Sequence, residues 1–156
     1  MKKLVFPDQF WWGGATSGIQ SEGAFFKQHK NMFDYWYEIN PDAFYDSVGP
    51  GVTSNFYYTY KEDIALMASL GLNSARTSIQ WSRLIDDFET ASVNQDAVDF
   101  YNKVIDEFVK HNITLVLNLH HFDLPMELYE KYGGWESAHV ADLYAKYAKT
   151  AFELFG

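Results

Sequence analysis

The sequence contains no cysteine, which excludes disulfide bonds and thiolate metal sites and is compatible with a reducing cytosol. No apolar run approaches the roughly 18 residues that a membrane-spanning helix needs. The chain starts with the basic Met1-Lys2-Lys3, but the apolar run that follows is too short for a signal peptide. We therefore predict a cytoplasmic protein without a membrane partner.

Basic residues are also scarce, since 12 Lys and Arg stand against 21 Asp and Glu and give a net charge of -9. Binding of a nucleic-acid backbone depends on clustered lysine and arginine, and no such cluster occurs in the sequence. We therefore predict no nucleic-acid partner. A phosphate-binding loop is also disfavoured, because Gly13 and Gly18 have the loop spacing but Ile19-Gln20 stands where Lys-Ser/Thr is required.

Aromatic residues, in contrast, are abundant and make up 19% of the chain. With 47% hydrophobic residues among 156, the chain has enough apolar material for one compact domain and too little for two. Tryptophan and tyrosine fill cores, but they also stack on flat apolar faces while offering a polar edge. Sugar rings present such faces, so a sugar ligand is one interpretation of this composition.

Hydrophobic periodicity predicts strands and helices in alternation. The first predicted strand is short and buried and begins with the aromatic residues from Phe10. Two further strands are predicted at residues 74–81 and 114–119. The helices are at residues 56–70, with Gly71 as the stop, at residues 95–110, and after a capping Ser137. Residues 31–51 show no sustained period and are predicted to form a long loop with a short helical turn near residues 33–37.

This alternation predicts an α/β fold with a parallel sheet, either doubly wound or a (β/α)8 barrel. The first strand lacks the dinucleotide-binding fingerprint, and the long aromatic and polar loops all follow strands, where a barrel places its site. About three βα units are fewer than the eight that close a barrel. The chain is therefore expected to be a piece of a larger protein.

The residues at the strand ends combine amide, imidazole and aromatic groups, which suit a polyhydroxylated ligand. A parallel sheet gathers the carboxyl ends of its strands at one edge, so these residues are expected to lie near one another. They are Gln20 with Glu22, Arg76 with Trp81, and His121 with Phe122 and Asp123.

Three alternatives concern the same residues. His120, His121 and Asp123 offer metal-ligand types, but adjacent strand residues point to opposite faces, so we predict no metal site. Glu22 and Asp123 are conceivable as the two carboxylates of a glycosidase, although acidic residues beside a strand end are more often backbone caps. For Arg76, the residues alone favour a structural ion pair with a buried carboxylate over a guanidinium that reaches the surface.

Three ordered blocks of motifs run through the whole chain. The first comprises Phe6-Pro7, residues 10–17, Gln20 and residues 22–24; the second comprises residues 60–67, Gly71, residues 76–79 and residues 81–83; the third comprises Val93-Asn94, residues 100–102, Ile105-Asp106, residues 121–125 and residues 133–135. In this order and at these spacings they resemble glycoside hydrolase family 1.

The resemblance implies the N-terminal part of a (β/α)8 barrel that hydrolyses β-glycosides with retention, using one glutamate as acid/base and another as nucleophile. It implies no cofactor. Gln20 and His121 should bind hydroxyls of the sugar, Arg76 should lie beside the nucleophile and hold it ionised, and Trp135 is expected to be a loop packing residue.

Both family glutamates lie in motifs that would follow Gly156, so no catalytic residue is assigned. The domain expected is residues 1–156 as the N-terminal portion of a single barrel domain, truncated before the fourth strand. By itself this chain is expected to be inactive. The partner expected is a small-molecule sugar, and a homo-oligomer of the full-length protein is left open.

Two residues narrow the expected substrate. Phe122 stands where many members that act on plain glucosides have Trp, and Thr77 stands where they often have Phe. Both resemble the bacterial branch that acts on 6-phosphorylated β-glucosides, such as cellobiose 6-phosphate, in carbohydrate catabolism. The alternatives are a β-glucosidase or β-galactosidase acting on unphosphorylated sugars, and an inactive truncated product or non-catalytic sugar-binding piece.

Overall fold

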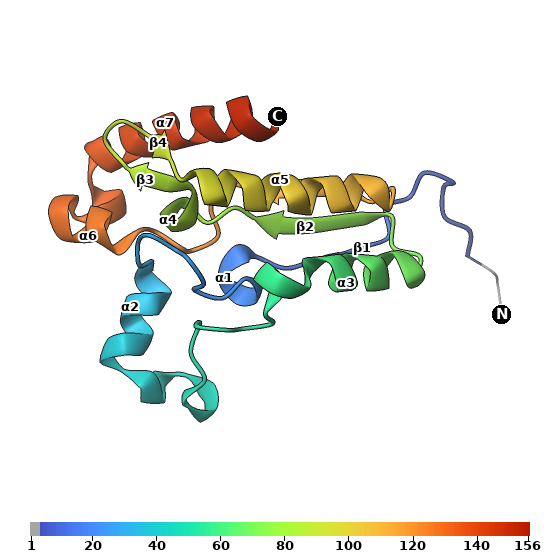
Figure 1. Ribbon diagram of the computed structural model, residues 1–156, viewed down its shortest axis with the longest axis horizontal. Coiled ribbons are helices and arrows are strands. Elements are labelled where there is room, and N and C mark those ends of the chain that lie inside the picture. The colour runs from blue at the N-terminus through green and yellow to red at the C-terminus, as the bar shows by residue number, and fades with distance from the viewer. Residues whose placement is uncertain (1–3) are drawn as a thin grey trace.

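The computed structural model of the protein describes residues 4–156, so the basic start at residues 1–3 lies outside the described residues. A three-stranded sheet in the order β1-β2-β5 forms its centre. The strands are β1 (Gly13–Ala15), β2 (Ser74–Ser78) and β5 (Thr114–Asn118). Figure 1 shows β1 and β2 of this sheet, with helices α3 (Phe56–Ser69) and α5 (Gln95–Lys110) running alongside them. A short antiparallel hairpin of β3 (Ile85–Asp87) and β4 (Ser92–Val93) lies apart from this sheet.

The helices are short near the strand ends and long where they return along the sheet. In chain order they are α1 (Gly18–Ser21), α2 (Met32–Ile39), α3 (Phe56–Ser69), α4 (Trp81–Leu84), α5 (Gln95–Lys110), α6 (Met126–Tyr132) and α7 (Ala138–Phe155). Single 3-10 turns occur at Pro41–Ala43, Tyr45–Ser47 and Gly134–Glu136. Among these, no helix is both long enough and apolar enough to cross a membrane.

The sheet is parallel, as predicted. Gly13 pairs with Ser74, and Ser74 pairs with Thr114, so the three strands run in register from the same end. Their carboxyl ends, Ala15, Ser78 and Asn118, consequently lie along one edge of the sheet, the edge at which the strands end. The connections after these strands are therefore brought to one end of the molecule, as the alternating pattern requires.

The positions of the long helices α3 and α5 were predicted closely, because amphipathic periodicity and end signals coincide. The predicted helix at residues 95–110 matches α5, and Asn94 caps it by accepting a hydrogen bond from Ala97 N at 3.0 Å. Gly71 follows α3 with a φ of +80°, a conformation that ends a helix at no steric cost to glycine. Ser137 is the N-cap residue of α7, but its side chain makes no capping hydrogen bond.

Two strand predictions were wrong. The strand predicted to begin at Phe10 begins at Gly13, and it is exposed rather than buried because β1 is an edge strand. The preceding aromatic residues contact one another instead of entering the core, with Phe10 and Trp12 ring centroids 4.6 Å apart. The second predicted strand is also too long, since Trp81 begins α4 and stacks on Tyr147 in the core.

Several short elements were not predicted or were predicted only in part. The supposed loop at residues 31–51, in which only a short helical turn near residues 33–37 was predicted, contains the eight-residue helix α2, because Asn31 and Asp34 form a capping box. Asn31 Oδ1 accepts hydrogen bonds from the amides of Phe33 and Asp34. Helix α6 and the β3-β4 hairpin were also missed, since both are too short to produce a period.

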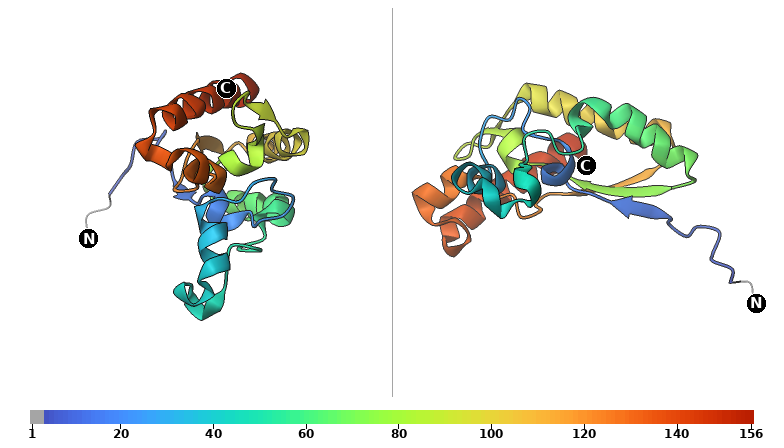
Figure 2. Two further views of the ribbon diagram at one scale, coloured as in Figure 1. Left: turned by 90° about the vertical axis from the view of Figure 1, so that its left-hand side faces the viewer. Right: turned by 90° about the horizontal axis from the view of Figure 1, so that it is seen from below.

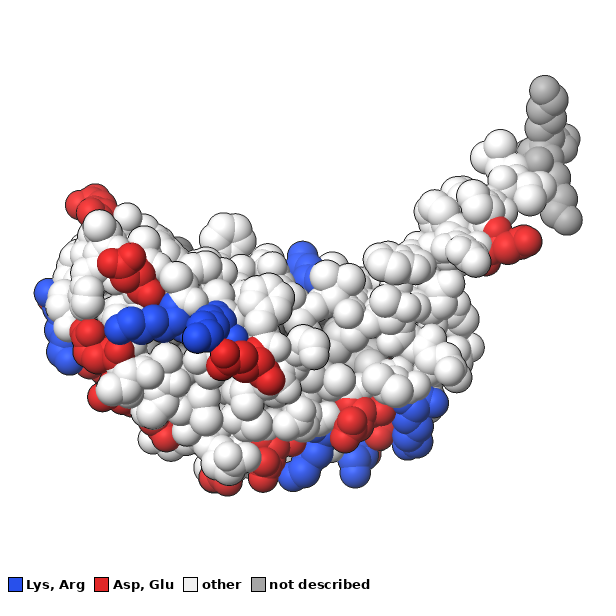
Figure 3. Space-filling model, turned by 90° about the horizontal axis from the view of Figure 1, so that it is seen from above, with Lys and Arg blue, Asp and Glu red and all other residues white. Residues whose placement is uncertain are grey.

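Helices cover one face of the sheet and leave the other open (Figure 2). On the covered side, buried residues of α3, α5 and α7 form one core with β2, and Ile64, Phe108 and Tyr147 are among its largest side chains. On the open side Val116 is 45% exposed. A hollow of about 270 Å³ lies there over β1 and β2. Charged residues of both signs gather along one side and one end of the molecule in Figure 3.

The burial pattern of α3 predicts that substitutions on its buried and exposed sides differ in their effect on stability. Ile64 is fully buried, whereas Leu66 on the same helix is 58% exposed. We expect Ile64→Ala to lower the free energy of unfolding by about 2–5 kcal/mol, because it removes buried methyl groups and leaves a cavity. Leu66→Ala is the matched control and should change it by no more than about 0.5 kcal/mol. Urea denaturation measures both, and equal effects of the two substitutions would contradict the assigned burial.

Candidate functional site

The predicted site residues follow the two outer strands of the sheet, β1 and β5, or lie in its middle strand, β2. Gln20 lies on α1, directly after β1, and is exposed. His121 and Phe122 follow β5, where His121 is half-buried and Phe122 is 70% exposed. Arg76 lies within β2, paired with Ala15 on one side and Val116 on the other. All four are at least partly accessible, and each of them follows or occupies one of the three parallel strands.

Gly18 fixes α1, and with it Gln20, against the end of β2. Its amide donates a hydrogen bond to Ser78 Oγ at 2.8 Å. A Cβ atom at this position would lie 2.7 Å from Gln80 Cγ and 2.9 Å from Ser78 O, so no larger residue fits. The Gln20 side chain is held at the helix start, where its Oε1 accepts a hydrogen bond from Ser17 Oγ at 2.8 Å.

Arg76 reaches the open face of the sheet. Its Nη1 donates to the carbonyl oxygen of Thr16 at 2.6 Å, and no carboxylate within residues 4–156 lies within 4.0 Å of its guanidinium. Residues 4–156 therefore do not supply the carboxylate partner of the structural ion pair that the residues alone favoured.

The imidazole of His121 is oriented by Asn118, the last residue of β5. Asn118 Nδ2 donates to the carbonyl oxygen of His120 at 3.1 Å and lies 3.4 Å from His121 Nδ1. An amide nitrogen only donates hydrogen bonds, so this contact favours an unprotonated Nδ1. The neutral ring then carries its proton on Nε2, which is a donor for a ligand hydroxyl. The ring of Phe122 lies edge-on to His121, with centroids 4.9 Å apart.

Asp123 is fully buried beneath this turn. Its Oδ1 accepts a hydrogen bond from the His121 amide at 2.8 Å, which confirms the backbone-cap interpretation of this residue. Burial raises its pKa to about 6, and the hydrogen bond from His121 opposes that shift. His120 Nδ1 lies 3.5 Å from the same oxygen, and burial lowers the pKa of this histidine. Within residues 4–156, no group of three or more His, Asp or Glu side chains is arranged to hold a metal ion.

Glu22 is also buried, but it faces Arg83 rather than the open edge. Its Oε2 accepts hydrogen bonds from Arg83 Nε at 2.9 Å, Gln80 Nε2 at 2.8 Å and Tyr101 OH at 3.2 Å. Burial raises the pKa of Glu22, although the Arg83 charge opposes this. Burial is the largest single effect on Arg83 and opposes its charged form, but the combined effects of Glu22, Tyr101 and Tyr57 raise the arginine's pKa. Glu22 is thus a structural carboxylate.

The same network extends to α2 through Gln80, whose Oε1 accepts from Asn31 Nδ2 at 3.2 Å. Lys27 pairs with Asp34 of α2 and also approaches Gln80 Oε1 at 3.5 Å. Burial lowers the pKa of Lys27, while Asp34 opposes the shift. Together these contacts join the connections after β1 and β2 and the start of α2 into one polar cluster.

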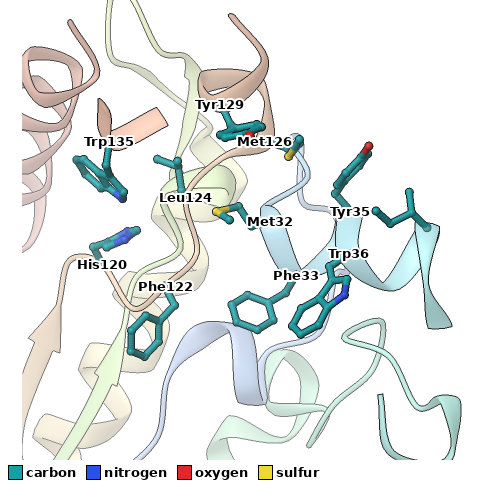
Figure 4. A pocket seen from close by; sticks show the side chains of 11 residues that line it. Met32, Phe33, Tyr35, Trp36, His120, Phe122, Leu124, Met126, Tyr129 and Trp135 are labelled. Atoms are coloured by element: carbon teal, nitrogen blue, oxygen red, sulfur yellow. The ribbon is translucent and has the colours of Figure 1, made fainter. Parts of the chain in front are cut away.

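An apolar pocket of about 580 Å³ opens beside this edge, between α2 and the connection after β5 (Figure 4). Phe122 and His120 border it on one side, and Phe33 and Trp36 border it on the other. Trp135 lies across from His120, with ring centroids 5.1 Å apart. Trp135 packs against Tyr144 as a loop residue, as predicted, and it also lines this pocket.

Three residues of the site were not singled out from the sequence. Asn118, Gln80 and Arg83 orient or anchor the others, but each is a single polar residue at the end of a strand or in a short helix. No spacing rule marks Gln80 and Arg83 as partners of Glu22, because they meet it across 58 and 61 positions in the chain. Asn118 lies only three positions before His121, but a single asparagine at a strand end is no distinctive signal. Trp81, which was expected at the edge, lies in the core instead, where its ring stacks on Tyr147 at 5.2 Å.

Comparisons with known proteins extend the resemblance. Residues 2–156 match the family profile described as "Glycosyl hydrolase family 1". The chain is 52% identical over 153 residues to 6-phospho-beta-glucosidase GmuD of Bacillus subtilis, covering 97% of this chain and 32% of that protein. It is 37% identical to 6-phospho-beta-glucosidase AscB of Escherichia coli, covering 97% of this chain and 35% of the relative.

Among solved structures, the psychrophilic beta-glucosidase BglU of Micrococcus antarcticus superimposes with a TM-score of 0.90 at 33% identity. The match covers 98% of this chain and 32% of that one. The chain therefore spans about a third of the length of the proteins it matches. The parallel α/β arrangement accordingly corresponds to about a third of a (β/α)8 barrel, which confirms the predicted fold class.

The buried carboxyl group of Asp123 predicts a pH-dependent contribution to stability. Its pKa of about 6 exceeds the value near 3.9 of an exposed aspartate, so the folded state favours the protonated form. The resulting stabilisation is complete below about pH 4 and is lost as the pH rises through about 6. Asp123→Asn keeps an oxygen acceptor but cannot ionise.

We therefore expect the wild type to lose up to roughly 3 kcal/mol of unfolding free energy relative to Asp123→Asn between about pH 4 and 7. Urea denaturation of both proteins across this range measures the difference. A difference that stays constant with pH would show that Asp123 is not the buried, ionisable group described.

Proposed function

Because the chain belongs to glycosyl hydrolase family 1, we propose that it is the N-terminal portion of a barrel enzyme that hydrolyses 6-phospho-β-glucosides. The observation that carries the substrate proposal is the 52% identity to a protein named 6-phospho-beta-glucosidase. Phe122 and Thr77, the residues that resemble the phospho-specific branch, support the same choice. The enzyme would act in the cytoplasm, which its likeness to these bacterial proteins supports.

In this proposal Gln20 and His121 bind hydroxyl groups of the sugar in the cleavage subsite. His121 Nε2 and the Gln20 amide supply donors and acceptors on either side of the sheet edge. Phe122 offers its exposed ring to an apolar face of the ligand. Arg76 would hold the nucleophilic carboxylate ionised, a role supported by its position on the open face without a carboxylate partner among residues 4–156.

The reaction itself would use two glutamates outside these 156 residues. One protonates the leaving oxygen while the other attacks the anomeric carbon, and water then opens the glycosyl-enzyme intermediate. The two carboxylates that follow strand ends, Glu22 and Asp123, are poorly suited to these roles. Glu22 is saturated by Arg83, Gln80 and Tyr101, and Asp123 is sealed beneath the His121 amide. We therefore assign neither a catalytic role.

Hydrolysis of unphosphorylated β-glucosides is the second candidate. It is favoured by the close superposition on a beta-glucosidase, with a TM-score of 0.90. The two candidates differ in a phosphate-binding group that would lie outside residues 1–156. Both candidate functions use the residues described above, so the geometry of residues 4–156 does not distinguish them. The preference for phosphorylated or unphosphorylated substrates does.

The proposal predicts a preference for phosphorylated substrates. We expect the complete protein to hydrolyse an aryl 6-phospho-β-glucoside with a kcat/KM about 10–100-fold above that for the unphosphorylated aryl glucoside, because charged hydrogen bonds contribute roughly 1.5–3 kcal/mol each. Release of the aryl group measures both rates. Residues 1–156 expressed alone are the negative control and should show no turnover.

A higher kcat/KM for the unphosphorylated substrate would overturn the phospho-assignment in favour of the second candidate. Turnover by residues 1–156 alone would contradict the placement of both glutamates outside this chain.

A further inference from the structure

Phe122 has an unusual backbone conformation at the proposed sugar site. Its φ is +65°, in the left-handed region that a phenylalanine rarely occupies. Residues held in such conformations persist only when surrounding contacts enforce them, and they cluster at functional sites. In this turn the conformation leaves the Phe122 ring 70% exposed and edge-on to His121. The left-handed conformation of Phe122 therefore requires an enforcing contact.

The carboxylate of Asp123 supplies that contact. Its Oδ1 accepts the His121 amide at 2.8 Å, so the hydrogen bond closes directly across Phe122. Asp123 is fully buried, and its Oδ2 has no hydrogen-bond partner within residues 4–156. A buried carboxylate oxygen without a partner is costly, which indicates that this residue is not there for stability alone.

The chain on the far side of Asp123 is fixed to the rest of the fold. Met32 N donates to the carbonyl oxygen of Leu124 at 3.0 Å, and Met126 N donates to that of Lys30 at 2.9 Å. Asn31 and Pro125 also form an isolated bridge. Asp123 therefore connects an anchored segment to the projecting His121 and Phe122.

The two adjacent histidines separate at this turn. His120 Nδ1 lies 3.5 Å from Asp123 Oδ1, and its ring packs against Trp135 in the apolar pocket (Figure 4). His121 instead contacts Asn118 and Phe122. The same carboxylate thus lies next to the side chain of one histidine and holds the backbone of the other.

We propose that Asp123 is a positioning residue, whose buried carboxylate holds the left-handed turn at Phe122 and so places the imidazole of His121 against the sugar. This inference rests on the proposed function, since it assigns Asp123 a part in the same site. Asp123 itself does not touch the substrate and acts through His121. Its removal should therefore matter only while His121 is present.

The test is a double-mutant cycle in the complete protein, with hydrolysis of an aryl 6-phospho-β-glucoside and of its unphosphorylated counterpart as the readouts. Asp123→Ala should lower kcat/KM by about 10–100-fold, because a small misplacement of a positioning group costs about that much. Asp123→Asn should stay within about threefold of the wild type, since the amide oxygen still accepts the His121 amide. Asp142→Ala, at an exposed aspartate of α7, is the matched control.

The decisive comparison is between His121→Ala alone and His121→Ala combined with Asp123→Ala. Equal kcat/KM values for these two variants are expected if Asp123 acts through His121. Losses that multiply, or an Asp123→Ala variant with wild-type kcat and KM, would overturn the proposal. If Asp123→Ala does not fold, Asp123→Glu takes its place, because it keeps the charge but displaces the acceptor. A wild type that cleaves neither substrate would instead overturn the proposed function, and this inference with it.

Discussion

The buried ion pair between Glu22 and Arg83 is the contact on which the arrangement of the strand-end connections depends. Both side chains are almost fully enclosed, and the Nε–Oε2 distance is 2.9 Å. Arg83 also donates to the carbonyl oxygens of Gly23 at 2.8 Å and Phe25 at 2.5 Å. A buried charge is tolerated only when it is paired and its remaining hydrogen-bonding groups are satisfied. This pair therefore fixes the chain after β1 against α4, which follows β2.

The ion pair between Glu22 and Arg83 determines which side chains are exposed where the strands end. With Glu22 occupied inside, the adjacent Gln20 is left exposed on α1. Asp123 plays a comparable part after β5, where its enclosed carboxylate accepts the His121 amide. In each case a buried carboxylate supports an accessible polar residue two positions earlier in the chain. The two carboxylates for which a catalytic role was weighed and not adopted are thus structural supports beside the proposed sugar-binding residues.

The sequence predicted the parallel α/β fold and the helices α3 and α5, because long amphipathic periods and end signals such as Gly71 depend on local residues. It also led to Gln20 and His121 through family motifs. It did not lead to the partners of Glu22, since Arg83 and Gln80 lie about 60 positions away and no local pattern marks them. The burial predicted for the first strand was wrong, because β1 is an edge strand of the sheet that the described residues form.

A double-mutant cycle on Glu22 and Arg83 tests this account most directly, using the free energy of unfolding from urea denaturation of the complete protein. Glu22→Gln should cost about 3–5 kcal/mol, because it leaves a buried guanidinium without its counter-charge. Adding Arg83→Met should recover a large part of that loss, so the two effects should be strongly non-additive. Effects that add to within about 0.5 kcal/mol would contradict the central role of this ion pair.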